Sequence, residues 1–520
     1  MKRRTFVKSL SAASLLLGQS PKLVNAQAMQ TLPPATATPN FDPDVEILLR
    51  AVVGETNLRE GSPTRIWRFM AELMKGPSDA LGFLDGSGHI PVIRVRRGQK
   101  IRIYFDNELP ESSIVHWHGL NIVQRMDGHP MYAIAPGARY VYEINIENRA
   151  GSYWFHPHPH ERTSYQVYQG LAGMLIVHDE EEAQASLPSG EHDIPLMIQD
   201  RSFDSDNQLV YIGPMRHNWM MGFSGDYVLV NGRVSYARTV SRTAHRVRIV
   251  NTSNASLYHL RWSDDTPFTV IATDGGLLET AREQASLTLG VGERVDVWVD
   301  FSRYEVSDQM HLLAQSYTPS LVNFTAEQGG MALQEGGRPI ASFRFTDEPP
   351  VAVTPPERLS EYAPFNAADA VNATSPRPIS ISMRRGSFYL NNQLFGGMQD
   401  VPEGNRVKLG VTEIWEFNND SAMGMGMGMG GMMQMAHPMH IHNVHFKVLS
   451  RTKDGLPNTQ HQQLSAGFTD YGLKDVVVVL PGEKVRVLVK FENHTGIYLY
   501  HCHILEHEDL GMMQNFLIEA

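Results

Sequence analysis

The segment Tyr498–Met513, with the sequence YLYHCHILEHEDLGMM, constrains this chain more than any other stretch. It contains the only cysteine, Cys502, directly between His501 and His503. In an extended strand successive side chains point to opposite faces, so the two histidines face one way and the cysteine faces the other. One tripeptide can therefore reach two different metal sites.

The residues after this tripeptide extend one of those sites. His507 and Met512 follow Cys502 in the same segment. A thiolate with imidazole and a weak thioether ligand is the donor set of a blue copper centre. A single cysteine also excludes an internal disulfide, and metal ligation explains why a free thiol is present. The two flanking histidines must then bind something else.

Short β-like runs bounded by turn residues predict an all-β protein. Four similar segments each consist of a turn glycine followed by an alternating strand, and they begin at Gly98, Gly292, Gly404 and Gly482. Strands that end on asparagine recur at about one domain length, and a chain of 520 residues suits about three domains. Short alternating strands at this spacing indicate Greek-key sandwiches or barrels.

Composition suggests where the three domains begin and end. We place them at residues 45–180, 190–346 and 377–520, with a proline-rich linker at 347–376. Helical patterns are sparse, and the best, Trp67–Met74, fits either a helix or a surface turn. The run Met423–Met435 has glycine at alternate positions, which weakens both helix and strand, so it predicts a mobile loop.

The N-terminus has the pattern of an export signal. Paired arginines in Lys2–Lys8 precede a short apolar run and the candidate cleavage site Ala26–Ala28. This pattern is similar to a twin-arginine signal, so we expect residues 1–28 to be removed and the mature protein to be periplasmic. No later segment has a membrane-spanning pattern. The formal charge of −11 argues against nucleic acid as a partner, and we expect a monomer.

Ten histidines and the cysteine fall into four compact groups. Each H-x-H on a strand directs both imidazoles at one face, which is the geometry that a shared metal cluster needs. One such motif alone fits ordinary surface histidines, but four of them with the sole cysteine indicate metal binding. The groups are His116 and His118; His156 and His158; His437, His440 and His442; and His501, Cys502, His503 and His507.

The four motifs in this order, H-W-H-G, H-P-H, H-P-M-H-I-H and H-C-H-x3-H-x4-M, resemble those of the multicopper oxidases. These are enzymes of three cupredoxin-like domains related to laccases, and the resemblance spans most of the mature chain. It implies four copper ions: one type 1 ion in the third domain, and a cluster of one type 2 and two type 3 ions between the first and third domains. The middle domain has no such motif, which agrees with a spacer role.

The resemblance also implies which residues bind each ion. The type 1 copper would be bound by Cys502, His437 and His507, with Met512 as the axial ligand. The type 2 copper would be bound by His116 and His440. The type 3 ions would be bound by His118, His156 and His503 on one ion, and by His158, His442 and His501 on the other.

Such a ligand arrangement predicts the reaction. Electrons that enter one at a time at the thiolate-bound copper can leave through the backbone of Cys502 into the cluster ligands beside it. Four stored electrons reduce one dioxygen molecule to two waters. Because this reaction consumes protons, acids near the cluster are expected, and Asp127 and Glu508 occupy positions that resemble the proton-relay acids of the family.

The methionine-rich run suggests the electron donor. Thioethers are soft ligands that select Cu(I), and the run ends just before His437. With the export signal, this resembles the bacterial periplasmic cuprous oxidases of copper tolerance. Met435 stands where that subgroup has a methionine that binds substrate copper, and Met433 stands where it has an aspartate. Glu161 also replaces a glycine of the family motif.

Two other functions stay open at this point. A laccase-like oxidase of phenols or aromatic amines would need an open approach to His507 or His437. A non-enzymatic alternative is a periplasmic protein that only sequesters copper. The complete ligand set argues against that alternative, because storage does not need a thiolate between two cluster ligands.

Overall fold

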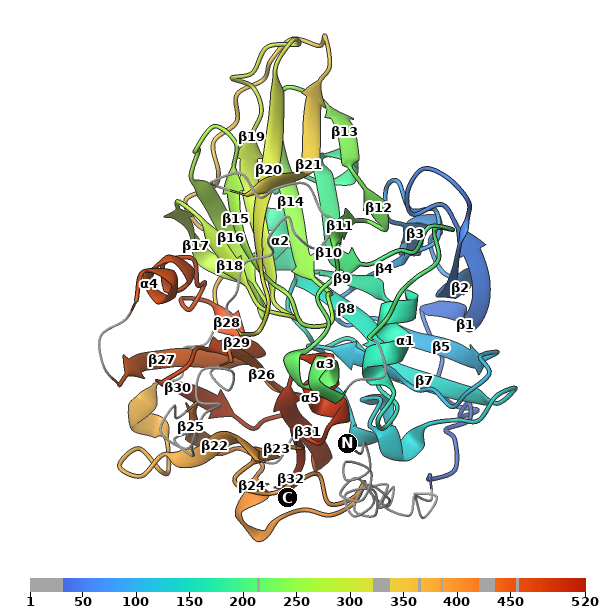
Figure 1. Ribbon diagram of the computed structural model, residues 1–520, viewed down its shortest axis with the longest axis vertical. Helices are drawn as coiled ribbons and strands as arrows, with labels where there is room; N and C mark the ends of the chain where they lie inside the picture. Colours follow the sequence, from blue (N-terminus) through green and yellow to red (C-terminus); the bar gives the residue numbers. More distant parts are fainter. Residues whose placement is uncertain are drawn as a thin grey trace, which may run out of the picture.

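The computed structural model describes residues 31–212, 216–320, 337–362, 366–384, 387–419, 435–454 and 458–520. The expected signal at residues 1–28 lies outside these ranges, as does the methionine-rich run apart from Met435. The described residues form six β-sheets and a few short helices, so the predicted all-β class is confirmed (Figure 1). Within the same residues, no helix combines the length and apolarity needed to cross a bilayer.

The N-terminal part forms two sheets, which we call the first sheet pair. Their strand orders are β2-β1-β5-β7 and β3-β4-β9-β8-β6. Aromatic side chains from both sheets meet in one core. The ring centroid of Phe69 lies 6.4 Å from that of Phe105 and 5.4 Å from that of Phe155. The strands are β1 Val45–Thr56, β2 Thr64–Lys75, β3 Leu81–Phe83, β4 Pro91–Arg96, β5 Lys100–Asn107, β6 Val115–His118, β7 Arg139–Asn145, β8 Gly151–Pro157 and β9 Gly173–His178.

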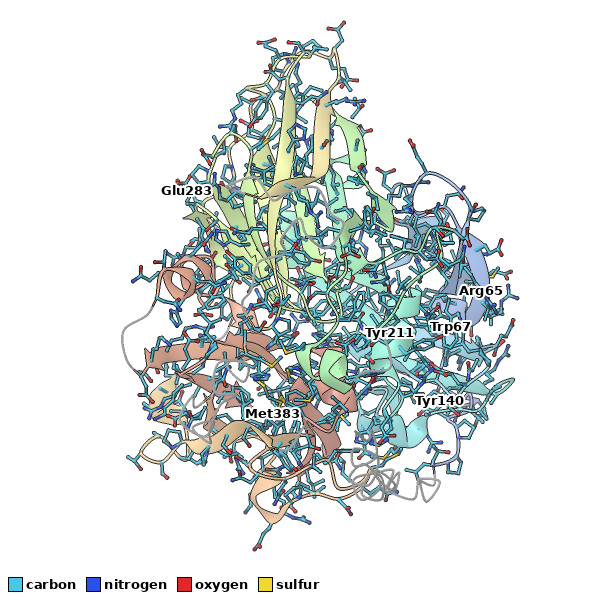
Figure 2. The ribbon with its side chains drawn as sticks, in the orientation of Figure 1. Arg65, Trp67, Tyr140, Tyr211, Glu283 and Met383 are labelled. Carbon is cyan, nitrogen blue, oxygen red and sulfur yellow. The ribbon has the colours of Figure 1, made fainter. Side chains whose placement is uncertain are left out.

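The interpretation of Trp67–Met74 as a helix or a surface turn is wrong. These residues lie in β2, an outer strand that pairs antiparallel with β1 along nearly its whole length (Figure 2). Trp67 and Phe69 are buried whereas Met70 and Met74 are exposed, as on a strand with one face in water. Pairing with β1 decides the conformation here, and an isolated segment does not contain that information.

The middle of the chain forms a second pair of sheets, the middle sheet pair, at the top of Figure 1. The strand orders are β12-β11-β10-β14-β19-β16-β17 and β13-β21-β20-β15-β18. The strands are β10 Asp193–Arg201, β11 Tyr227–Val230, β12 Arg233–Val234, β13 Tyr236–Val240, β14 Ala244–Asn251, β15 Leu257–Trp262, β16 Phe268–Thr273, β17 Gly276–Gln284, β18 Leu287–Leu289, β19 Arg294–Asp300, β20 Gln309–Tyr317 and β21 Arg338–Phe345.

The C-terminal part forms the third sheet pair, with orders β23-β22-β25-β30-β27-β28 and β24-β32-β31-β26-β29. Its second sheet sets β26 beside β31, which aligns His440 with His501 and Met439 with Cys502. The strands are β22 Arg377–Arg384, β23 Ser387–Leu390, β24 Arg406–Lys408, β25 Thr412–Asn418, β26 His437–Ile441, β27 Phe446–Lys453, β28 Leu473–Lys474, β29 Val476–Val479, β30 Glu483–Lys490, β31 Gly496–Cys502 and β32 Met513–Glu519.

The three sheet pairs use residues 45–178, 193–345 and 377–519. Each range lies inside one of the expected domains, whose exact limits stay a prediction. Five short α-helices lie in the connections between strands of the described residues, and α1, α3 and α5 lie together where the three sheet pairs meet (Figure 1). The helices are α1 Thr163–Gln169, α2 Glu180–Gln184, α3 Arg216–Met221, α4 Thr459–Ala466 and α5 Leu505–Asp509.

A buried ion network joins the first and middle sheet pairs. Asp296 on β19 accepts hydrogen bonds from Ser152 on β8 at 2.7 Å, from Arg246 at 2.6 Å and from Arg248 at 3.1 Å. Both arginines also pair with Glu182 on α2. Burial alone would raise the pKa of Asp296, but the two guanidinium charges lower it below its ordinary value.

We expect Asp296→Asn to lower the free energy of unfolding by about 3–5 kcal/mol at neutral pH, because it leaves two buried guanidinium groups short of an anion. A lowered pKa in the folded state stabilises the protein above the ordinary carboxylate pKa, and that contribution is lost as the pH falls. The difference between wild type and variant should therefore shrink below about pH 4. Urea unfolding at several pH values measures it, and a difference that grows in acid would contradict the assignment.

Candidate metal centre

Four strands, with the residue directly after three of them, carry eight of the predicted histidines into one buried space. In the first sheet pair β6 and β8 align His116 with His156, and in the third β26 and β31 align His440 with His501. Histidines of the two sheet pairs are in contact, because the ring of His116 stacks on the ring of His442 with 3.8 Å between their centroids. All eight are almost fully buried: His116, His118, His156, His158, His440, His442, His501 and His503.

Hydrogen bonds fix the tautomers of several of these rings. Nδ1 of His116 donates to the carbonyl of Asp127 at 2.6 Å, and Nδ1 of His440 donates to the carbonyl of Asp475 at 2.8 Å. Because a carbonyl only accepts, each proton sits on Nδ1 and each Nε2 keeps a lone pair. Both Nε2 atoms are buried without a hydrogen-bond partner among the described residues. Unpartnered buried lone pairs are costly, and a metal ion would satisfy them.

The facing rings of His442 and His501 also have buried lone pairs. His442 donates its Nδ1 proton to Asp127 Oδ2 at 2.8 Å, and His501 donates its Nδ1 proton to the carbonyl of Cys502 at 3.1 Å. Their Nε2 atoms, which are then both acceptors, lie only 3.1 Å apart. Burial lowers the pKa of both imidazoles, so neither ring is charged. A cation bound by the two Nε2 atoms would satisfy both lone pairs.

Possible ligand sets overlap in this space. Several groups of three residues have ligand atoms within 4.8 Å of one another. One of them, His158, His442 and His501, is the set that the family resemblance implies for one of the type 3 ions. The other expected type 3 set, His118, His156 and His503, is arranged differently. His156 lies in a set with His116 and His118, and His503 Nε2 lies 3.1 Å from His118 Nδ1. The structure thus places all eight predicted residues together, in groups that partly differ from the expected division.

A second set surrounds the cysteine on the other face of β31. Cys502 Sγ lies 3.5 Å from His437 Nδ1 and 3.7 Å from His507 Nδ1. His507 donates its Nε2 proton to the carbonyl of Met220 at 3.1 Å, so its Nδ1 lone pair faces the sulfur. Met512 is buried, and its backbone bonds to both Cys502 and His507. Burial raises the pKa of the thiol, and a bound metal cation is what would hold it as a thiolate.

The two predicted acids each contact two cluster histidines. Asp127 binds His442 and lies 3.5 Å from His116 Nδ1. Glu508 lies 3.4 Å from His158 Nε2 and 3.3 Å from His501 Nδ1. Burial raises the pKa of both carboxyl groups, so both can carry a proton at a higher pH than an exposed acid.

The predicted substrate methionines are only partly described. Met435 is buried, and its carbonyl accepts a hydrogen bond from Asn419 Nδ2 at 2.7 Å. Met433 lies outside the described residues. Met435 therefore holds the C-terminal end of the methionine-rich run in the core next to His437.

Two residues that contact the predicted metal-ligand histidines, Asp475 and Met220, were not among those predicted from the sequence. Asp475 binds His118 and His440, and Met220 on α3 accepts the hydrogen bond from His507. An acid directly before the apolar strand β29 was a weak signal for Asp475, since acids are rarely buried without a partner. The contact of Met220 is made by its backbone, so residue type carried no signal.

Comparison with known proteins identifies a family that matches this geometry. Family models described as multicopper oxidase match residues 70–182, 204–329 and 370–520. A multicopper oxidase of Staphylococcus epidermidis is 31% identical over 84% of this chain and 83% of its own length. The crystal structure of the McoA multicopper oxidase from Aquifex aeolicus is 34% identical, with a TM-score of 0.73 over 94% of this chain and 99% of that one.

Other relatives differ in the activity that their names give. A laccase of Bacillus subtilis is 28% identical over 88% of this chain and 90% of its own length. A multicopper oxidase structure from Campylobacter jejuni, described as a metallo-oxidase, is 25% identical with a TM-score of 0.71 over 94% of this chain and 96% of that one. The chain is thus similar both to a laccase and to a metallo-oxidase.

Proposed function

The chain belongs to the multicopper oxidase family, and from this premise we propose that it oxidises Cu(I) and reduces dioxygen to water. The family consists of oxidoreductases that contain copper and use dioxygen with a reducing substrate. The sequestering alternative therefore does not hold, since the chain is an enzyme. The observation that carries the reaction is the H-C-H at the end of β31. Cys502 lies in one ligand set with His437 and His507, whereas His501 lies in another with His158 and His442, and His503 faces His118 in the same buried space.

We assign four copper ions to these sets. Cys502, His437, His507 and Met512 would hold the type 1 ion, and the eight cluster histidines would hold one type 2 and two type 3 ions. Bound copper would supply one-electron oxidation of the donor and four-electron reduction of dioxygen. The protein directs the lone pairs of the ligands, excludes water from the buried cluster, and places Asp127 and Glu508 to deliver protons.

The surroundings of His507 favour a small donor over an aromatic one. His507 is fully buried, its Nε2 proton is held by the Met220 carbonyl on α3, and Phe388 stacks on its ring at 3.9 Å. An aromatic substrate cannot contact the edge or face of this ring directly, because both are already covered. A soft metal ion passed along thioethers needs no such open face.

Copper tolerance is the proposed role. The methionine-rich run before His437 and the similarity to the C. jejuni metallo-oxidase support Cu(I) as donor. The twin-arginine-like N-terminus supports export of the folded protein to the periplasm. The second candidate is oxidation of phenols, which the similarity to the B. subtilis laccase favours.

Two variants of the methionine-rich run test the donor. Replacing the six methionines between Met423 and Met433 by leucine keeps their bulk but removes the thioethers, so we expect kcat/KM for Cu(I) to fall by roughly tenfold or more, with phenol oxidation unchanged. Deleting Met423–Met433 should also lower Cu(I) oxidation but leave phenol oxidation equal or higher. Met70→Leu with Met74→Leu, on the exposed face of β2, is the matched control and should change neither rate. Loss of phenol turnover with Cu(I) turnover unchanged would favour the laccase-like function.

A further inference from the structure

One buried arginine connects the middle sheet pair to the histidine cluster. Arg294, the first residue of β19, is fully buried and uses all five N–H donors of its guanidinium group. Two bind Asp475, from Nη1 to Oδ1 at 2.5 Å and from Nη2 to Oδ2 at 2.6 Å. The other three bind the carbonyls of Ser152, Gly292 and Asp274. Residues of all three sheet pairs therefore hold the guanidinium group in place.

Asp475, which Arg294 holds in place, in turn orients two cluster histidines. Its Oδ1 accepts the Nε2 proton of His118 at 3.0 Å, and its carbonyl accepts the Nδ1 proton of His440 at 2.8 Å. These bonds leave Nδ1 of His118 and Nε2 of His440 with lone pairs. The two rings stack at 3.9 Å, although one comes from the first sheet pair and the other from the third.

The backbone keeps space for this arrangement at two glycines. A Cβ on Gly119 would lie 2.6 Å from Arg294 Nη2 and 2.7 Å from Asp475 Oδ2, so a side chain there would displace the pair. A Cβ on Gly292 would lie 3.1 Å from the rings of both His118 and His503. The turn before β19 thus packs directly against two cluster histidines.

Among the described residues, Arg294 is the only arginine or lysine that pairs with Asp475. The nearest lysine in the chain, Lys474, binds Asp274 at 3.1 Å and Glu293 at 2.9 Å instead. A buried carboxylate without a paired cation is strongly unfavourable, so Arg294 is what keeps Asp475 in place as an anion. Losing Arg294 would release Asp475 and, with it, the orientation of His118 and His440.

We propose that Arg294 is a positioning residue for the copper cluster, which it orders through Asp475, His118 and His440. Copper binding by the first and third sheet pairs then depends on docking of the middle sheet pair, which is more than the spacer expected from its lack of histidine motifs. The inference rests on the proposed copper ligands.

Arg294→Met tests this in the copper-loaded full chain, with Arg246→Met as the matched control. Both substitutions remove a buried arginine of the middle sheet pair from an aspartate, but Arg246 binds Asp296 and Glu182, neither of which is bonded to a cluster histidine in the described residues. We expect Arg294→Met to bind cluster copper roughly 10- to 100-fold more weakly, as measured by chelator competition and by the type 2 signal in electron paramagnetic resonance. Its blue absorption, which depends on Cys502, should persist. Arg246→Met should keep wild-type copper affinity.

Arg294→Lys is the second variant, for the case in which Arg294→Met does not fold. Lysine keeps the charge but not the two-point contact with Asp475, so we expect weaker copper binding at a melting temperature no lower than that of Arg246→Met. Wild-type affinity in the Arg294 variants, or an equal loss in Arg246→Met, would overturn the inference while leaving the proposed function intact. A wild-type protein that binds no copper would contradict both.

Discussion

Oxygen uptake by the Cys502→Ser variant is expected to fall to the uncatalysed rate with Cu(I) and with a phenol, and the blue absorption to disappear. Cys502 Sγ lies 3.5 and 3.7 Å from the Nδ1 atoms of His437 and His507, in the only thiol-containing set of the described chain. A serine hydroxyl is a hard oxygen donor that does not replace a soft thiolate. The variant would therefore lose the entry point for electrons, whichever donor is used.

Metal analysis separates this result from misfolding. The eight cluster histidines are held by other residues, so Cys502→Ser should lose one copper ion and keep the cluster. Met513→Leu is a control in the same segment, since it changes a buried methionine that the assignment leaves unliganded, and it should retain colour and turnover. Cu(I)-dependent oxygen uptake by Cys502→Ser above the uncatalysed rate would contradict the assigned electron path.

The histidine groups could be predicted because their information is local. An H-x-H on a strand directs two rings to one face regardless of what lies opposite, as in β6, and β31 carries His501 and Cys502 with His503 directly after it. The all-β class followed for the same reason, from turn glycines and alternating runs. Trp67–Met74 was misread because its strand depends on β1, which precedes it in the chain and is not part of the segment's own pattern.

The residues that orient the ligands could not be predicted in this way. His118 and Asp475 are 357 positions apart, and His507 and Met220 are 287 apart. Such contacts depend on how the three sheet pairs dock, which no short motif records. The middle sheet pair illustrates this, because it has no histidine motif and still places Arg294 and α3 beside the two sites.

Asp127→Asn is expected to slow oxygen reduction by roughly 10²-fold while leaving the blue colour and the copper content intact. An asparagine oxygen can still accept the Nδ1 proton of His442, and the Asp127 carbonyl that holds His116 is unchanged. The variant therefore keeps the ligand orientation and loses only a group that can deliver a proton. Reduction of the type 1 site by donor should proceed at the wild-type rate, so stopped-flow absorption separates the two half-reactions.

The pH dependence gives a second readout of the same role. Burial raises the pKa of Asp127, so in the wild type the acid keeps its proton beyond the ordinary carboxylate range and oxygen reduction should slow as the pH rises past that pKa. Asp127→Asn should lose this decline, because its amide does not titrate. Asp127→Ala removes the acceptor for His442 as well and should also weaken cluster copper. Unchanged turnover in Asp127→Asn would remove Asp127 from the reaction, and loss of copper in that variant would assign it to holding ligands instead.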